Sequence, residues 1–320
     1  MNDFLSIRDM TGKQLRDLID LAIHIKSSPD SYAYALKGLS MAMIFEKPSL
    51  RTRVTFDIGM HQLGGHAMYL SPAEISMGKR ESVHDVAKNL ERMVDAIMIR
   101  TFTHATIEEL AKHASIPVIN GLSDYSHPCQ AVADFMTVLE SRGKLAGIKL
   151  AYFGDGNNVA RSLAFAGALL GAHVVVCSPR GYELDGKTLD WAQKAAKVSG
   201  GSCMFTDDCE LASTKADVIY TDVWASMGQE AEAESRAKIF RPYQVTPELF
   251  RKATKDALFL HCLPAHRGEE VSAQVIDSAR SLVFQQAENR LHAQKAILYT
   301  LLHDRSLRHV RTHAEELTSV

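Results

Sequence analysis

Short apolar runs alternate with stretches of helical periodicity along almost the whole chain of 320 residues. Between these runs, large apolar side chains recur about every 3.6 residues, as in Phe56, Met60 and Leu63. The runs predicted to be strands are Leu39–Phe45, Ala67–Leu70, Ala96–Arg100, Pro117–Asn120, Lys149–Phe153, His173–Ser178, Ser202–Thr206, Ala216–Thr221, Ala257–Cys262 and Ser281–Gln285. Because alternating strands and helices form parallel sheets with helices on both faces, we predict an α/β fold. It should have two doubly wound domains, each a mostly parallel sheet flanked by helices.

A polar stretch, Glu140–Gly147, follows a long helical pattern and precedes a new strand. It divides the chain into halves of similar size, each long enough to bury a core of its own. We therefore expect a first domain over residues 1–140 and a second over residues 148–292. The C-terminal helix, from about residue 293 to 320, is expected to return to the first domain.

Charge and apolar content exclude several classes of protein. The net charge of -2 provides no basic field to hold nucleic acid or an anionic membrane. The longest apolar stretch, Leu163–Cys177, has about 15 residues, fewer than the roughly 20 that span a bilayer. Five cysteines without a C-x-x-C pair favour reduced thiols. We expect a cytoplasmic protein that acts on small molecules.

The segment from Phe45 to Arg53 follows a strand and begins an amphipathic helix. Ser49 is a natural N-cap, and free backbone N–H groups at a helix start bind anions. Arg51, Thr52 and Arg53 add positive charge and a hydroxyl donor. Capping alone would explain the serine, but two arginines around a threonine favour a phosphate site.

Two further segments end or follow strands of the first half. Arg100 ends a predicted strand, where ligands of open α/β sheets bind, although an ion pair explains it equally well. His127-Pro-Cys-Gln130 precedes a helix, with proline at its first position. There His127 can donate to a carbonyl oxygen and Gln130 can hold an amide, whereas a lone histidine is more often a cap or core residue.

The second half opens with Gly154-Asp-Gly156, which is superficially similar to a dinucleotide fingerprint. Val159 replaces the third glycine, and no acidic residue ends the next strand. We therefore expect no nicotinamide cofactor. Asn157 and Asn158 instead place two amides at a helix start, where they can meet a carboxylate.

Asp222 ends another predicted strand and can bind the ammonium group of an amino acid. The loop that follows contains Ser226 and Met227. His261 and Cys262 end a further strand, but no second ligand pair with metal-site spacing is present, so we expect no metal. A nucleophilic role for Cys262 would need a base and an oxyanion site, which no neighbouring residue supplies.

Taken together, these segments resemble the aspartate/ornithine carbamoyltransferase family over nearly the whole chain. Ser49-Leu-Arg-Thr-Arg53 is similar to the family motif S-T-R-T-R, and His127-Pro-Cys-Gln130 to its H-P-x-Q motif. Asp222-Val-Trp-Ala-Ser-Met-Gly228 and His261-Cys-Leu-Pro264 are similar to two signatures that separate ornithine enzymes from aspartate enzymes. The resemblance implies transfer of a carbamoyl group from carbamoyl phosphate to the δ-amine of L-ornithine, giving citrulline and phosphate. The alternatives are another amine acceptor, such as putrescine, and a non-catalytic binding homologue.

The resemblance also implies site residues and an assembly. The phosphate would contact Ser49, Leu50, Arg51, Thr52 and Arg100. The carbamoyl end would contact His127, Gln130, Cys262, Leu263 and Arg290, and ornithine would contact Asn158, Asp222, Ser226 and Met227. Arg100, His127, Asp222 and Cys262 would be the catalytic residues. The family forms trimers in which a loop of the neighbouring subunit, here around Ser76, completes the phosphate site. Leu50 departs from the usual threonine, and Ser76 from the usual glutamine or histidine.

Overall fold

The computed structural model describes residues 2–75, 77–78, 80–225 and 230–318 of the chain. It divides into two compact units. The first comprises Met1–Ser6, Asp17–Cys129 and Arg290–Val320, and the second comprises Ile7–Arg16 and Gln130–Asn289. The chain passes between them after Ser6 and within helices α1 (Gly12–Ser27), α6 (Pro128–Arg142) and α13 (Val283–Thr318).

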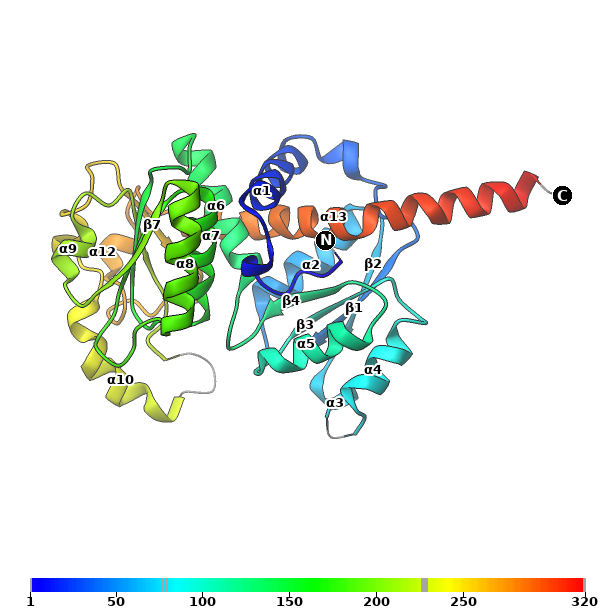
Figure 1. Ribbon diagram of the computed structural model, residues 1–320, viewed down its shortest axis with the longest axis horizontal. Coiled ribbons are helices and arrows are strands. Elements are labelled where there is room, and N and C mark those ends of the chain that lie inside the picture. Colours follow the sequence, from blue (N-terminus) through cyan, green and yellow to red (C-terminus); the bar gives the residue numbers. More distant parts are fainter. Residues whose placement is uncertain (1, 76, 79, 226–229, 319–320) are drawn as a thin grey trace. The chain divides into compact units, whose positions relative to one another are not determined.

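The first unit contains a four-stranded parallel sheet with the order β2-β1-β3-β4 (Figure 1). Its strands are β1 (Ser40–Phe45), β2 (His66–Leu70), β3 (Ala96–Arg100) and β4 (Val118–Leu122). The central strand β3 is buried along its whole length, whereas β2, at the edge, is partly exposed. In the register of β1 and β3, Phe45 is paired with Arg100, so both strands end at the same edge.

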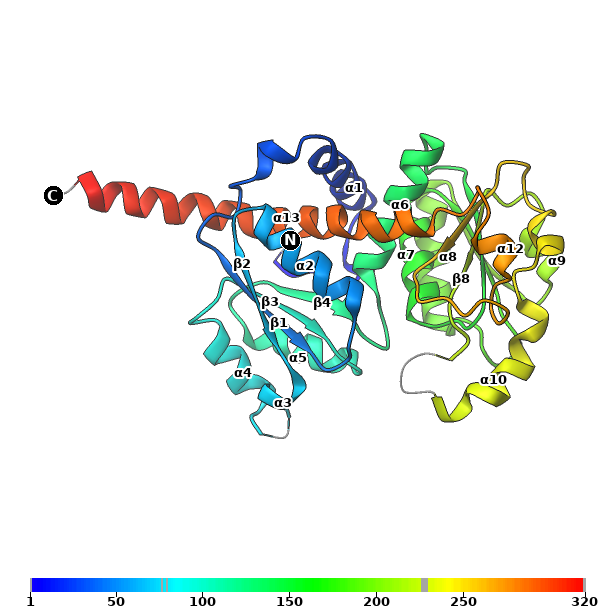
Figure 2. The ribbon, with the colours of Figure 1, turned by 180° about the vertical axis from the view of Figure 1, so that it is seen from behind.

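Helices cover both faces of this first sheet (Figures 1 and 2). On one face, α2 (Leu50–Gln62) packs against α13, where a Cβ on Gly59 would lie 3.4 Å from Lys295. On the other face, α4 (Val83–Leu90) and α5 (His104–His113) share an aliphatic core with β1 and β3. The unit also contains the short helices η2 (Pro29–Tyr32) and α3 (Pro72–Ile75).

The second unit contains a five-stranded parallel sheet with the order β7-β6-β5-β8-β9. Its strands are β5 (Lys149–Phe153), β6 (His173–Cys177), β7 (Ser202–Thr206), β8 (Val218–Thr221) and β9 (Leu258–His261). Helices α7 (Asn158–Leu170) and α8 (Gly186–Ser199) lie on one face, and α9 (Cys209–Ser213) and α12 (Ala273–Ile276) on the other (Figures 1 and 2). The remaining helices are η1 (Ile7–Asp9), η3 (Glu230–Glu232), α10 (Ala233–Phe240), η4 (Arg241–Tyr243) and α11 (Pro247–Phe250).

The predicted fold class is confirmed, because each unit is a parallel sheet with helices on both faces. One predicted strand is wrong. In the segment 281–285, only Ser281 forms a single bridge, to Phe259, and α13 begins at Val283. The short apolar run there leads into the first turn of a helix, in which Val283 is buried and Phe284 is exposed, and periodicity over five residues cannot distinguish such a turn from a strand. As a result, the last helix begins ten residues earlier than the predicted start at 293.

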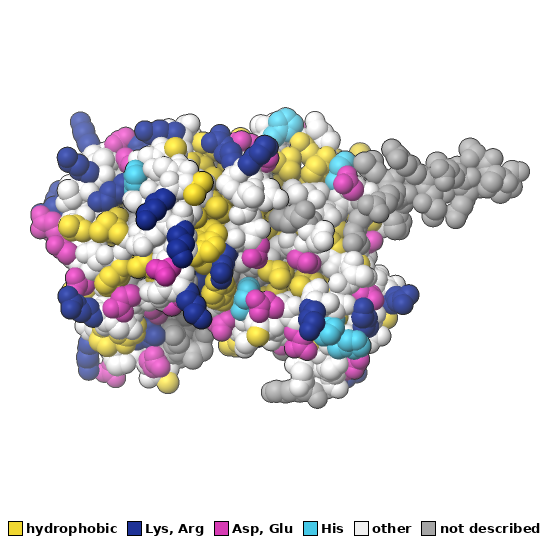
Figure 3. All heavy atoms as spheres, in the orientation of Figure 1, with side chains coloured by type: hydrophobic (Ala, Val, Ile, Leu, Met, Phe, Trp, Pro, Cys, Tyr) yellow, Lys and Arg dark blue, Asp and Glu magenta, His cyan; other side chains and the backbone are white. Residues whose placement is uncertain are grey.

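Basic and acidic side chains lie among one another on both units in the face drawn in Figure 3. Such mixing agrees with the small net charge of -2. None of the helices within the described residues has the length and apolar character that a membrane crossing requires.

Candidate active site

The turn between β1 and α2 presents a capped helix start. Ser49 has extended backbone, and its side-chain oxygen accepts a hydrogen bond from the Thr52 N–H, with an N–O distance of 3.2 Å. This capping bond fixes the first turn of α2, where the backbone N–H groups and the helix dipole favour an anion. Thr52 is buried, and its hydroxyl oxygen accepts a hydrogen bond of 3.2 Å from the guanidinium of Arg290.

Three guanidinium groups of the first unit surround His127, which is buried just before α6. Burial holds the pKa of His127 well below its usual value, and the positive charges of Arg290, Arg100 and Arg51 lower this pKa further. Arg100 and Arg290 are themselves buried. Several cations near one neutral imidazole form a site that an anion would stabilise strongly, because burial weakens solvent screening.

Two other side chains of the motif, those of Leu50 and Arg53, point elsewhere. Leu50 is 74% exposed, so its side chain lies outside the cluster around His127. The guanidinium of Arg53 lies over the ring of Tyr69, at 3.9 Å from its centroid. Within the motif, the charge near His127 therefore comes from Arg51, and Arg53 packs on the neighbouring strand β2.

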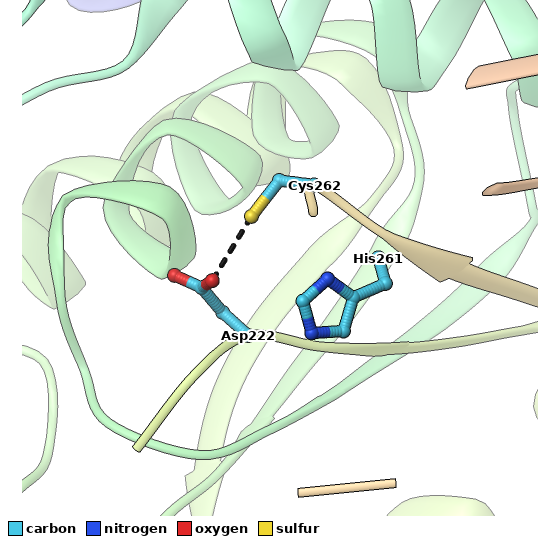
Figure 4. Close-up of side chains that lie close together, drawn as sticks. All are labelled: Asp222, His261 and Cys262. Carbon is cyan, nitrogen blue, oxygen red and sulfur yellow. Dashed lines mark hydrogen bonds between the residues drawn. The ribbon is translucent and has the colours of Figure 1, made fainter. Parts of the chain in front are cut away.

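In the second unit, three side chains meet at the carboxyl ends of β8 and β9 and the start of α7, namely those of Asn157, Asp222 and Cys262. Asp222 follows β8 and is buried. One of its oxygens accepts hydrogen bonds from the Cys262 thiol, at 3.0 Å, and from the Val223 N–H, at 2.8 Å. Its other oxygen accepts a bond of 2.9 Å from the Asn157 amide. Figure 4 shows the sulfur of Cys262 directed at this carboxylate, with His261 beside it.

Asn157 also caps helix α7. Its side-chain oxygen caps α7 by accepting hydrogen bonds from the N–H groups of Val159, at 2.9 Å, and Ala160, at 3.1 Å. The same amide therefore anchors the helix start with its oxygen and orients Asp222 with its nitrogen. The result is a buried carboxylate held at both oxygens and flanked by a thiol, which is a suitable environment for an amine.

Both nitrogens of His261 have protein partners. The N–H of Leu263 donates to Nδ1 at 2.8 Å, so in the neutral ring the proton resides on Nε2, which faces the Glu270 carboxylate at 3.1 Å. His261 and Glu270 are fully buried. Ligand atoms of Asp222, His261 and Cys262 lie within 4.8 Å of one another, and hydrogen bonds join Cys262 to Asp222 and His261 to Glu270. The pair fixes the backbone after Cys262, where Leu263 has a φ of 57°.

Gln130 lies in a buried polar network of the second unit. Its amide donates to Asp134 at 2.8 Å. Asp134 also accepts hydrogen bonds from Gln286, at 2.6 Å, and from the hydroxyl of Tyr220, at 3.2 Å. These bonds fix the orientation of Gln130 on α6.

The chain matches two family models and many known proteins. The carbamoyl-P binding domain of aspartate/ornithine carbamoyltransferase matches residues 2–140, and the Asp/Orn binding domain of the same family matches residues 146–301. A relative named ornithine carbamoyltransferase from Thermococcus kodakarensis is 54% identical over 298 residues, which cover 92% of this chain and 95% of the relative. The chain belongs to the aspartate/ornithine carbamoyltransferase family.

Solved structures give the same result. The ornithine carbamoyltransferase from Pyrococcus furiosus aligns with a TM-score of 0.90 and 54% identity, covering 93% of this chain and 96% of that one. The enzyme of the same name from Thermus thermophilus aligns with a TM-score of 0.85 and 46% identity, covering 94% and 99%. The sequence-based resemblance to this family is therefore confirmed.

The structure places the predicted residues in two groups. In the first unit, His127 lies near Arg51, Arg100 and Arg290, and Arg290 contacts Thr52. In the second unit, Cys262 contacts Asp222, and Leu263 is fixed through His261. Three predicted residues, Ser76, Ser226 and Met227, lie outside the described residues. The predicted contact of Asn158 with the substrate stays a prediction.

Three residues with contacts at these sites were not among the predicted substrate contacts. Asn157 was expected to meet a carboxylate at the helix start, and it contacts the Asp222 carboxylate while capping α7. Glu270 contacts His261 from nine residues away, a spacing that carries no motif. Lys47 is buried, with its ammonium 4.2 Å from the centroid of the Phe102 ring. Its position two residues before Ser49 was the only hint.

Proposed function

We propose that this protein transfers the carbamoyl group of carbamoyl phosphate to the δ-amine of L-ornithine, giving L-citrulline and phosphate. The observation that carries the proposal is the buried Asp222 carboxylate, held by Asn157 and contacted by the Cys262 thiol. A negatively charged, oriented group of this kind binds an amine. The names of relatives that are 54% identical over most of the chain support the same substrate.

Carbamoyl phosphate is assigned to the domain of residues 1–140, together with the C-terminal helix from about 293 to 320. Its phosphate would bind the start of α2 through Ser49, the backbone of Leu50, Arg51, Thr52 and Arg100. The capped helix start and the guanidinium groups near His127 support this assignment. Because His127 is kept neutral, it would act as a hydrogen-bond donor to the carbamoyl oxygen, with Arg290 and Gln130 at the same end of the substrate.

Ornithine is assigned to the domain of residues 148–292, with Asn158, Asp222, Ser226, Met227, Cys262 and Leu263 as its contacts. An alkyl ammonium has a reference pKa of about 10.4, so the δ-nitrogen has to lose a proton before it attacks. Asp222 and Cys262 would orient the nitrogen, and removal from water favours its neutral form.

The reaction then needs positioning and charge stabilisation. The δ-nitrogen forms a bond to the carbamoyl carbon, and negative charge develops on the carbamoyl oxygen. Thr52, Arg100 and His127 would stabilise this oxyanion. The carbon–oxygen bond to phosphate breaks, and the departing phosphate takes up the proton of the amine. Most of the rate acceleration would come from holding both substrates in register.

A colorimetric citrulline assay with purified protein tests the activity, and a panel of amines tests the acceptor. We expect citrulline from ornithine and little product from putrescine, which has no α-carboxylate. Product from putrescine alone would favour the alternative acceptor. Binding of carbamoyl phosphate without turnover of any amine would favour a non-catalytic homologue.

We also propose a homotrimer or a multiple of trimers. Leu50, Val54 and Ile58 are exposed at spacings of four residues on α2, and such an apolar stripe on a helix is typical of an interface. Sedimentation equilibrium should give a multiple of three times 35.4 kDa. A monomer at micromolar concentration would contradict the assembly. The variant Val54→Glu should contain more monomer than the wild-type protein at the same concentration.

A cytoplasmic location is proposed on the basis of the thiols. All five cysteines are free, and thiols persist where glutathione keeps them reduced. Fractionation of cells with an antibody to the protein would test it, and recovery in an oxidising compartment would contradict it.

A further inference from the structure

Cys177 and Cys209 form a pair of thiols away from the proposed substrate contacts. Cys177 is the last residue of β6 and Cys209 is the first residue of α9, and their sulfurs are 3.7 Å apart. We propose that this pair is a reversible oxidation site, at which small-molecule disulfides convert the dithiol into a disulfide bond between β6 and α9.

The geometry requires only a small approach of the two sulfurs. A disulfide has an S–S length of about 2.05 Å, so the sulfurs need to move together by roughly 1.7 Å. Cys177 belongs to a buried apolar cluster of the second unit, in which Tyr243 and Val245 also lie, and Cys209 packs against this cluster. The pair is thus held together by the packing of two different elements, and side-chain rotation can supply the approach.

The environments of the two sulfurs assign different roles to them. The Cys177 thiol is buried and donates its hydrogen to the sulfur of Cys209. This hydrogen bond lowers the pKa of Cys209 and raises that of Cys177. Cys209 is partly exposed, so it meets both requirements of an attacking thiol, access and thiolate character.

The other cysteines differ from this pair. Burial raises the pKa of Cys129 and that of Cys203 to about 12, so their thiolates are scarce at neutral pH. Cys262 directs its thiol at Asp222 and belongs to the proposed ornithine site. The pKa of Cys177 is raised as well, so Cys177 is assigned as the resolving thiol by the 3.7 Å between its sulfur and that of Cys209.

The oxidation proceeds in two exchange steps. The Cys209 thiolate attacks one sulfur of the small disulfide, which forms a mixed disulfide and releases one small thiolate. Cys177 then gives up its proton, and its sulfur attacks the Cys209 sulfur and releases the second small thiolate. The protein loses two protons and two electrons, and the small disulfide is reduced to two thiols. An excess of a dithiol reductant reverses both steps.

Peptide mapping after treatment with oxidised glutathione tests the proposal. Trypsin separates residues 162–180, which contain Cys177, from residues 198–215, which contain Cys203 and Cys209. We expect these two peptides to be covalently linked in the treated wild-type protein and separate after dithiothreitol. The link should persist in Cys203→Ser and disappear in Cys209→Ser.

Several outcomes would overturn the proposal. They are unlinked peptides in the treated wild-type protein, glutathione retained on Cys209 without a link, and a link that Cys203→Ser removes. Thermal unfolding provides a second readout, because a cross-link closing a loop restricts the unfolded chain. The midpoint should rise on oxidation of the wild-type protein and of Cys203→Ser, but not of Cys209→Ser. An unchanged midpoint in the linked protein would show that the bond strains the fold, contrary to the geometry above.

Discussion

Replacing Asn157 with alanine tests the arrangement around Asp222 most directly. The substitution removes the amide that donates to one Asp222 oxygen at 2.9 Å, and it also removes the cap of α7. The other Asp222 oxygen keeps its bonds from Cys262 and Val223. The carboxylate should therefore remain buried, but it should no longer be held at both ends.

The magnitude follows from these contacts. A hydrogen bond to a charged group contributes about 1.5–3 kcal/mol, so kcat/KM for ornithine should fall by about 10- to 150-fold. Loss of the cap should lower the free energy of unfolding by about 1 kcal/mol. The KM for carbamoyl phosphate should change less than twofold, because Asn157 is assigned to the other substrate.

Two further variants separate the two effects. Asn157→Asp keeps a cap oxygen but places a negative charge beside Asp222, so ornithine use should fall while the cap persists. Asp208 caps α9 by accepting the N–H groups of Glu210 and Leu211, as Asn157 does for α7, and it lies after β7, at a different strand end from Asp222. Asp208→Ala should therefore lose similar stability and keep its kcat/KM for ornithine. Steady-state citrulline assays and urea unfolding measure both quantities. Full ornithine activity in Asn157→Asp, or equal losses in the two alanine variants, would refute the role of the amide.

Further predictions concern other parts of the site. Leu50→Thr, which restores the usual family residue, should change the KM for carbamoyl phosphate less than twofold, since the side chain is 74% exposed; a tenfold change would place that side chain at the phosphate. The pKa of His127 is held well below 6.5 in the folded protein, so the unfolded chain binds this proton first as pH falls. The stability that the neutral histidine provides is therefore present above about pH 6.5 and is lost on acidification below it. His127→Gln should make the urea midpoint of unfolding less dependent on pH between about 7.5 and 5.5. If the midpoint of the variant varied with pH as steeply as that of the wild-type protein, the depressed pKa would be contradicted. Arg236 binds the Asp155 carboxylate at 2.7 Å and the Trp224 carbonyl at 3.1 Å, and Trp224 lies two residues after Asp222, which is assigned to ornithine. Arg236→Met should therefore raise the KM for ornithine several-fold and change the KM for carbamoyl phosphate little. Equal changes in both KM values would argue for general unfolding.

The alternation of apolar runs was sufficient to predict both sheets, because buried parallel strands are nearly continuous apolar segments. β1 and β3 show this clearly, and both lie within predicted runs. The method failed at residues 281–285, where the first turn of α13 is as apolar as a short strand. Periodicity becomes informative only over several turns, so a five-residue window had to be assigned without it.

Site residues were predictable where the residue types of a single short segment were enough to indicate what it binds. The capping serine and the arginines at the start of α2 form such a segment, and so does Asp222 at a strand end. Contacts that join distant segments had no such signal. Glu270 reaches His261 from beyond a turn, and Asn157 reaches Asp222 across 65 residues of sequence. Neither pairing follows from residue type. The register of β5 with β8 places Asn157 beside Asp222, and the turn after β9 returns Glu270 to His261.

This distinction explains why supporting residues are harder to predict than substrate contacts. A substrate contact needs one side chain of the right type at a strand or helix end, and the pattern of strands and helices locates such ends. A supporting residue needs a partner that the tertiary fold brings close, so its role depends on strand order and register. The order β5-β8-β9 places the ends of three strands side by side, and these ends supply or precede Asn157, Asp222 and Cys262. With a different strand order, the same three residues would be separate polar groups at one sheet edge, and Asp222 would have lost the donors that hold its carboxylate in place.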